Sequence, residues 1–243
     1  MIEQQAVVTT RYGRMPAFFA CPEDGERHPG IIVYMDAPGM REEICNIGRR
    51  IANQGYACLV PDLYYRLGTL RFDIPRRNPL MSRVIGAAKD SLDNAMVLDD
   101  TAGLIAWLDA RDCVRPGPIG VIGYCMSGCY VMAAAAVYAD RIAAAASLYG
   151  IGLVTDQPDS PHLMADRIKG EMYYGFAEVD PAVPDHVVPD LTAALDAAGT
   201  RYEMETIPDC HHGFQSPERP DYNPVAAEHA WQKVYALWER NLR

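Results

Sequence analysis

The sequence predicts an α/β fold: a mostly parallel sheet with helices on both faces. Apolar runs of strand length alternate with amphipathic runs of helical length, which is the order that a β-α-β-α architecture needs. Several short runs, such as residues 30–36 (GIIVYMD), are apolar almost throughout, as is typical of parallel strands buried on both faces. The chain has 243 residues, 49% of them hydrophobic. We therefore expect residues 1–243 to form a single domain with one large core.

The first half of the chain is expected to begin with an edge hairpin. The predicted elements are strands at 6–10, 15–21, 30–36 and 56–61, a helix over about 41–54, and one helix that ends near residue 112. Gly55 follows the first helix, where helices commonly end in glycine. Residues 62–79 are irregular and rich in Arg and Tyr. A loop of that length in a compact domain is usually functional, so we expect a lid there.

The second half repeats the alternation. Strands are predicted at 118–124, 142–149, 171–176 and 201–207, and helices at 126–138, 187–198 and 224–242. The helix at 126 follows its strand without a loop. That junction is the most informative local feature of the sequence.

The composition argues against several classes of partner. The net charge is −10 and the isoelectric point is near 5.0, whereas nucleic acids and anionic membranes select basic patches. The N-terminus lacks the basic and then apolar pattern of a signal peptide. The seven cysteines are scattered, without a C-x-x-C pair, as reduced thiols would be. We expect a cytoplasmic protein, monomeric or dimeric, that binds a small molecule and neither nucleic acid nor membrane.

The strand–helix junction has the sequence IGYCMSG over residues 122–128. Such a turn holds one reactive side chain at its tip, and small residues two positions to either side let the strand and helix pass closely. Gly123 and Ser127 are those small residues, so Cys125 is at the tip. The helix N-terminus favours a thiolate, and the backbone N–H of Met126 can face a developing oxyanion. We interpret Cys125 as a nucleophile.

Ser127 is the alternative nucleophile. It would need small residues at positions 125 and 129, and both are cysteines, so the pattern fits Cys125 better. A lone cysteine is more often an inert core residue. The position of Cys125 at the tip of the turn favours the catalytic interpretation.

A thiol nucleophile also needs a base. Residues 208–214 (PDCHHGF) lie between the last predicted strand and the last helix, where a hydrolytic triad on such a sheet carries its base. His212 is the candidate base, and His211 is the alternative. A metal site made of Cys210, His211 and His212 is disfavoured because consecutive ligands rarely face one ion together. We expect no metal.

The acid that orients the base is expected on the loop after the preceding strand. That loop lies within GFAEVDPAVP at residues 175–184. Asp180 precedes Pro181, which favours an extended or turn conformation beyond the strand end. Glu178 and Asp185 are alternatives, and each is better explained as a solvated loop carboxylate. The chain order nucleophile, acid, base is the one expected for this architecture.

Four segments together resemble the dienelactone hydrolase family of the α/β-hydrolase superfamily. They are GYCMSG at 123–128, AEVDP at 177–181, HGF at 212–214, and the stretch from Gly55-Tyr56 to PDLY at 61–64. The resemblance spans nearly the whole chain, and the Gly-Tyr-Cys turn is specific because most α/β-hydrolases carry serine there. It implies a Cys-His-Asp hydrolase of small cyclic esters or related carboxylic esters, without a cofactor. Attack by the thiolate would pass through a thioester.

The resemblance also implies roles for further residues. In YMDAPG at 34–39, Asp36 replaces the family's usual glutamate near the resting thiol; it either takes that role or is a structural turn residue. Ala37 would supply the second oxyanion N–H. Tyr149 matches a Tyr-Gly of the family and either bonds in the site or packs against it. Tyr124, in the Gly-Tyr-Cys turn, is a further candidate site residue.

One departure from the family bears on the substrate. Members that act on dienelactones resemble one another in an arginine shortly after His-x-Phe, which binds the substrate carboxylate. Here Gln215 and Ser216 follow. Arg219 is one replacement, because an arginine fork matches a carboxylate. The other is the basic cluster of Arg66, Arg71, Arg76, Arg77 and Arg83, which is otherwise a solvated surface.

Rival functions belong to other classes. A non-catalytic small-molecule binding protein on this fold would be marked by a missing triad member, and none is missing. A redox protein would pair Cys125 with Cys129 or Cys210, although a disulfide between residues one helical turn apart requires distortion. Thiol titration before and after mild oxidation separates that case. A carboxylesterase with a different ester substrate is the nearest alternative.

Overall fold

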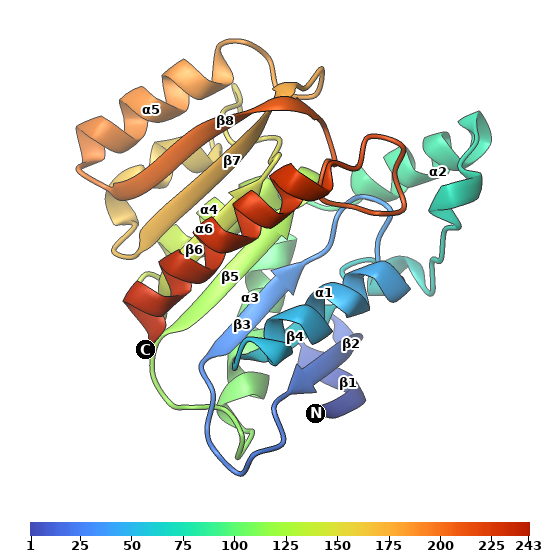
Figure 1. Ribbon diagram of the computed structural model, residues 1–243, viewed down its shortest axis with the longest axis vertical. Coiled ribbons are helices and arrows are strands. Elements are labelled where there is room, and N and C mark those ends of the chain that lie inside the picture. The colour runs from blue at the N-terminus through green and yellow to red at the C-terminus, as the bar shows by residue number, and fades with distance from the viewer. The chain divides into compact units, whose positions relative to one another are not determined.

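The computed structural model describes residues 1–243, which divide into two compact units, Met1–Gly120 and Val121–Arg243. Figure 1 colours the first unit from blue to green and the second from green to red. Eight strands form the sheet in the order β1-β2-β4-β3-β5-β6-β7-β8. The predicted α/β class with a mostly parallel sheet is confirmed.

The first unit begins with an antiparallel hairpin of β1 (Ile2–Thr10) and β2 (Gly13–Cys21). β2 pairs antiparallel with β4 (Ala57–Pro61), which pairs in parallel with β3 (Gly30–Tyr34). Every residue of β3 and β4 is buried, as their continuous apolar runs predict. The edge strand β1, by contrast, is largely exposed.

The helix α1 (Glu42–Asn53) packs against β2 and β4. Residues 62–79, the predicted lid, contain two short 3₁₀ turns, η1 (Tyr65–Leu67) and η2 (Ile74–Arg76). Most side chains from residue 66 to residue 80 are exposed or half-buried. A lid role for this segment stays a prediction.

One predicted helix is in fact two. The helices α2 (Pro79–Lys89) and α3 (Asn94–Asp109) replace the single helix expected to end near residue 112. The Asp93 side chain accepts a hydrogen bond from the Met96 N–H at 2.7 Å, so Asp93 caps a new helix. The apolar pattern continues across the break at residues 90–93, which is why periodicity alone missed it.

The second unit carries β5 (Ile119–Tyr124) from the boundary onward, followed by β6 (Ile142–Leu148), β7 (Glu171–Val179) and β8 (Arg201–His211). The pairs β6–β7 and β7–β8 are parallel. Its helical elements are η3 (Cys125–Ser127), α4 (Gly128–Val137), η4 (Pro161–Arg167), α5 (Val187–Ala198) and α6 (Pro224–Leu242). α4 packs on β6, and α6, red in Figure 1, packs on β6 and β7.

Strand β8 continues to His211, beyond its predicted end at residue 207. After Ala177 pairs with Ile207, the next pair is Val179 with His211, so β8 carries a bulge. Pro208, directly after the predicted end, lacks the N–H that a regular strand ladder uses. A bulge is one of the few places in a sheet where proline is tolerated.

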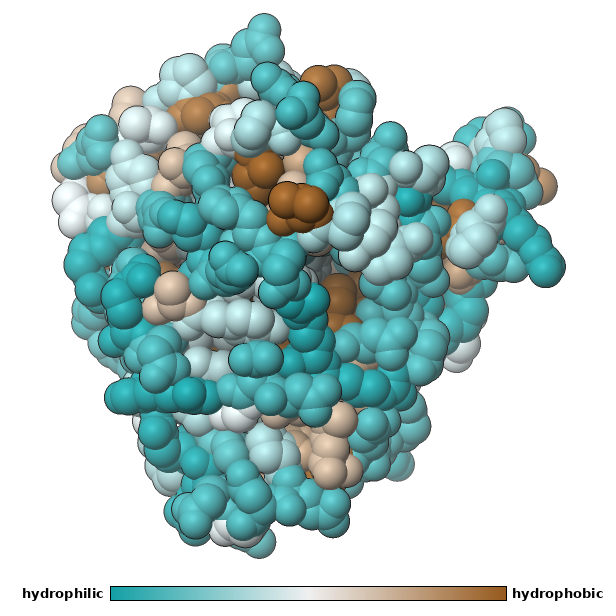
Figure 2. Space-filling model, in the orientation of Figure 1, coloured by the Kyte–Doolittle hydropathy of each residue, from teal (hydrophilic) through white to brown (hydrophobic).

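One face of the molecule is seen in the space-filling view. The face in Figure 2 is mainly hydrophilic, with hydrophobic side chains singly or in small groups. None of the helices combines the length and the apolar character needed to cross a membrane.

Candidate active site

Cys125 lies at the turn that joins β5 to the helical run of η3 and α4. The backbone of Cys125 is left-handed, with φ 55°, a conformation that costs an L-residue about 1–2 kcal/mol. The carbonyl of Cys125 accepts a hydrogen bond from the Ile151 N–H at 2.9 Å. The turn is therefore anchored to the segment after β6. Strain of this kind persists where the surrounding structure holds it, often at functional sites.

Two glycines make this tight turn sterically feasible. A Cβ on Gly123 would lie 2.7 Å from Cγ2 of Val131 and 2.9 Å from the carbonyl oxygen of Ser127. A Cβ on Gly128 would overlap the Cα of Gly150. The sequence pattern identified Gly123, but it missed Gly128 and Gly150, because their contact joins segments that are distant in sequence.

Ser127 is fully buried. Cys125, with 7% of its surface exposed, is the more accessible of the two candidate nucleophiles. Ser127 precedes α4 and occupies the small-residue position expected by the sequence pattern. Its placement favours a packing role.

His212 and Asp180 are hydrogen-bonded across the ends of β8 and β7. The Nδ1 of His212 lies 2.7 Å from Oδ2 of Asp180. The other carboxylate oxygen of Asp180 accepts from the Ala182 N–H at 2.9 Å, and its side chain is only 3% exposed. A carboxylate only accepts hydrogen bonds, so Nδ1 carries the proton and Nε2 is left for a second partner.

That second partner is Cys125. Burial of His212 disfavours its charged form and lowers the pKa, but hydrogen bonds to Asp180 and to Cys125 outweigh burial. Together they raise the pKa of His212 from 6.5 to about 9. The structure thus brings the three sequence-predicted side chains together in one connected chain of hydrogen bonds.

The alternative residues lie elsewhere. His211 is the exposed last residue of β8, and its carbonyl accepts from the Phe214 N–H. The Glu178 carboxylate is bonded to the backbone N–H of Asp209, and Asp185 is exposed. No group of three or more His, Cys, Asp and Glu side chains is arranged to hold a metal ion.

Aromatic rings support the imidazole. The ring of Tyr149 meets that of His212 edge-on at 5.2 Å between centroids, and that of Phe214 at 5.4 Å. Tyr124 lies 6.0 Å from Tyr149. Tyr149 has φ 38°, so its backbone is also held in the left-handed region. Of the two roles expected for Tyr149, packing is visible here.

The sequence matches the dienelactone hydrolase family over residues 15–242. The chain belongs to this family. A protein of Synechocystis sp. named "Putative carboxymethylenebutenolidase" is 28% identical over 233 residues, which cover 95% of this chain and 93% of that protein. A Bradyrhizobium protein named "Probable 2-oxo-3-(5-oxofuran-2-ylidene)propanoate lactonase" is 24% identical over 91% of this chain and 88% of its own.

Solved structures show the same fold. The crystal structure titled "Putative Dienelactone Hydrolase" from Klebsiella pneumoniae has a TM-score of 0.84, with 24% identity and 98% of both chains covered. An acylaminoacyl peptidase has a TM-score of 0.74, with 15% identity, and matches 99% of this chain but 41% of the peptidase. Both neighbours share the α/β-hydrolase fold with this chain. The family match over residues 15–242 places the chain among ester or lactone hydrolases.

Asp36, the residue that replaces the family's glutamate, has a partner of its own. Its two carboxylate oxygens accept from the guanidinium of Arg41 at 2.6 and 3.1 Å, and Asp36 is 2% exposed. Arg41 also donates to the carbonyl of Gly39. Of the two roles that the sequence allowed, this pairing favours the structural one.

Ala37 follows Asp36 in the first unit. Its carbonyl accepts a hydrogen bond from the Tyr64 hydroxyl at 2.7 Å, which fixes the backbone of this residue. A contribution of the Ala37 N–H to an oxyanion hole stays a prediction.

Arg219 packs directly against Gly213, the residue after His212. A Cβ on Gly213 would come within 2.6 Å of Cδ of Arg219, and the backbone of Gly213 has φ 88°, a conformation that favours glycine. Two arginines of the basic cluster pair with carboxylates: Arg66 with Asp100 at 2.8 Å and Arg71 with Asp62 at 2.8 Å. A role of Arg219, or of an arginine of the basic cluster, in binding a substrate carboxylate stays a prediction.

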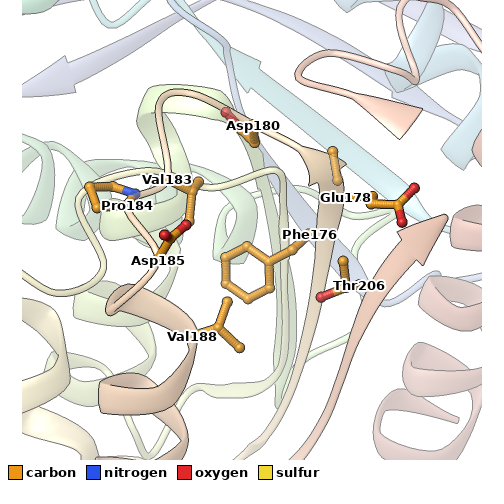
Figure 3. A pocket seen from close by; sticks show the side chains of 9 residues that line it. Phe176, Glu178, Asp180, Val183, Pro184, Asp185, Val188 and Thr206 are labelled. Atoms are coloured by element: carbon orange, nitrogen blue, oxygen red, sulfur yellow. The ribbon is translucent and has the colours of Figure 1, made fainter. Parts of the chain in front are cut away.

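A pocket of about 250 Å³ lies beside Asp180, between β7, β8 and the start of α5. Figure 3 shows the Phe176 ring and Val188 inside it, with Asp180 at its upper end and Glu178 pointing away from Phe176. Neither Cys125 nor His212 lines this pocket. The pocket therefore adjoins Asp180 but not the thiol of Cys125.

Proposed function

We propose that this chain is a cysteine-dependent hydrolase of a small ester or lactone, with Cys125 as nucleophile, His212 as base and Asp180 as the acid that orients the base. The observation that carries the proposal is the left-handed Cys125 hydrogen-bonded to a His212 that is itself bonded to Asp180. A thiol bonded to an imidazole that is bonded to a carboxylate is the arrangement that activates a nucleophile.

The first half of the reaction forms a thioester. His212 takes the proton of Cys125, and the thiolate attacks the carbonyl carbon of the ester. The tetrahedral oxyanion is stabilised by the Met126 N–H at the start of the helical run, with Ala37 proposed as the second donor. Each such donor is worth on the order of 3 kcal/mol. The carbon–oxygen bond then breaks, and His212 returns its proton to the departing alcohol or enol.

The second half releases the acid. His212 removes a proton from water, the resulting hydroxide attacks the thioester, and the carbon–sulfur bond breaks. The thiolate leaves and the carboxylic acid departs. Asp180 keeps Nδ1 of His212 protonated throughout, so that Nε2 faces the reacting atoms in both halves.

We propose that the substrates are lactones or enol esters in preference to amides. The tetrahedral intermediate expels the better leaving group, and a thiolate leaves more readily than an amine. An enolate is a good enough leaving group to be expelled in place of the thiolate. Enol esters and other activated esters therefore go forward to the thioester. The named lactonase and carboxymethylenebutenolidases among the relatives support this class.

The test is hydrolysis of p-nitrophenyl acetate and of an enol lactone by wild type and by Cys125→Ala, each with and without iodoacetamide. We expect both the substitution and alkylation to abolish activity. Cys113→Ala, which removes a more exposed thiol, is the control and should keep full activity. Full activity in Cys125→Ala would contradict the proposal, as would faster turnover of amides than of enol lactones.

We further propose a reducing, cytoplasmic location. All seven cysteines are free thiols, and the proposed nucleophile must stay reduced to act. The reaction requires only substrate and water, and the chain is proposed to work as a monomer or dimer.

A further inference from the structure

The bulge of β8 lies at the base of the proposed catalytic pair. The last regular pair of the β7–β8 ladder is Ala177 with Ile207, and the next is Val179 with His211. Glu178 alone therefore stands opposite residues 208–210. Asp180 and His212 each follow that final pair by one residue. The bulge therefore determines the position of His212 relative to Asp180.

The middle of the bulge is conformationally strained. Asp209 has φ 55°, a left-handed conformation that L-residues seldom adopt. Pro208 beside it has no N–H to give to the ladder. A backbone in this state relaxes unless neighbouring groups hold it.

Two side chains hold Asp209 from either side. The Glu178 carboxylate accepts a hydrogen bond from the Asp209 N–H, with 2.8 Å between Oε2 and N. The Asn223 amide, which caps α6, donates to the Asp209 carbonyl at 3.5 Å and to Sγ of Cys210 at 3.6 Å. Glu178 lines the edge of the pocket, and in Figure 3 its carboxylate points away from the Phe176 ring, which fits a side chain that bonds to the neighbouring strand.

We propose that Glu178 is a positioning residue for ester hydrolysis. It holds the bulge at Asp209, and the bulge keeps His212 within hydrogen-bond distance of Asp180. The inference rests on the proposed function, because it takes His212 as the base. A bulge beside an active site commonly aims a functional side chain. If Asp209 relaxed, β8 would shift along β7, and His212 would move relative to both Asp180 and Cys125.

The test compares Glu178→Ala, Glu178→Gln and Asp185→Ala. The glutamine variant keeps an oxygen that accepts from the Asp209 N–H, whereas alanine does not. Asp185→Ala removes an exposed carboxylate of the same loop. Each variant is assayed for kcat and KM with p-nitrophenyl acetate. The pH dependence of Cys125 alkylation by iodoacetamide, read by peptide mass spectrometry, gives a second readout that needs no turnover.

In Glu178→Ala we expect kcat to fall about ten- to hundredfold, as a small misplacement of a catalytic group can cause, with KM nearly unchanged. Its alkylation profile should shift in pH, because His212 loses part of its bond to Asp180. Glu178→Gln and Asp185→Ala should both resemble wild type. Thermal unfolding of all three variants checks that they fold.

Three results would overturn the inference: a Glu178→Ala variant with wild-type kcat and alkylation profile, a change confined to KM, or a Glu178→Gln variant as impaired as alanine. If the wild type hydrolyses no ester, the proposed function fails on its own. The alkylation profile still decides the positioning role, since a shift in Glu178→Ala supports it and an unshifted profile overturns it.

Discussion

Cys125 and His212 are held in place by different physical means. Cys125 is fixed by its backbone, which the turn between β5 and η3 keeps in a left-handed conformation. His212 is fixed by its side chain, which is bonded to Asp180 at 2.7 Å and packed edge-on against Tyr149. The nucleophile therefore depends on the local backbone geometry, and the base depends on its neighbours.

Replacing Asp180 by asparagine should change the pH dependence of hydrolysis. Burial is the largest influence on His212 and lowers its pKa, while Asp180 is the largest of those that raise it to about 9. In wild type His212 stays protonated until about pH 9, so it can protonate a poor alkoxide leaving group up to that pH. The rate with an alkyl ester should then decline as the pH rises further.

In Asp180→Asn this decline should move to lower pH, towards the ordinary histidine value of 6.5. We also expect kcat to fall by about 10²- to 10⁴-fold, the usual contribution of an oriented base. The measurement is kcat/KM against pH for an alkyl ester. A decline that stays near pH 9 in the variant would show that Asp180 does not control His212.

At the scale of elements, the strand–turn–helix from β5 to α4 is the feature that presents the thiol. The strand and the helix approach so closely that Gly123 faces Val131 and the Ser127 backbone, and Gly128 faces Gly150. Side chains at these glycines would push the helix away from the strand, so the turn and the packing of α4 depend on one another.

Gly123→Ala should destabilise the protein by about 1–3 kcal/mol, because overpacking forces the backbone to move. The control is Gly86→Ala in α2, where a Cβ meets nothing within 4 Å. Alanine there should stabilise by about 0.5–1 kcal/mol, through its better helix propensity. Urea unfolding measures both. Equal stabilities for the two variants would contradict the close approach at Gly123.

Much of the fold could be predicted because its core strands are continuous apolar runs. β3, β4 and β5 are buried along their whole lengths, and each was predicted within a few residues. The break between α2 and α3 was missed, because the apolar pattern continues through it and the capping residue Asp93 is the main sign that a new helix begins. The end of β8 was missed because its bulge is held by Glu178 and Asn223, which are distant in sequence.

The candidate site could be predicted where a local motif carries it. Cys125, His212 and Asp180 each follow a strand end in a recognisable pattern, and the structure brings them together. The pairing of Asp36 with Arg41 could not be foreseen, because the family resemblance suggested another partner for Asp36. The packing of Arg219 on Gly213 likewise depends on how the loop before α6 folds back.

At the scale of the whole molecule, the proposed triad belongs to one compact unit. Cys125, Asp180 and His212 all lie within Val121–Arg243, on the ends of β5, β7 and β8. The geometry that activates the thiol is therefore set inside that unit. The oxyanion role of Ala37 and the lid role of residues 62–79, both in the first unit, stay predictions.

The measurement that tests the central claim most directly is mass spectrometry of the protein quenched in acid during turnover of p-nitrophenyl acetate. We predict a protein heavier by one acetyl group, with the label mapped to Cys125 and removed by hydroxylamine, as a thioester is. His212→Ala should form this species more slowly. An acetyl group on Ser127, or turnover with no acetyl group detected on Cys125 under conditions where deacylation limits the rate, would contradict the claim.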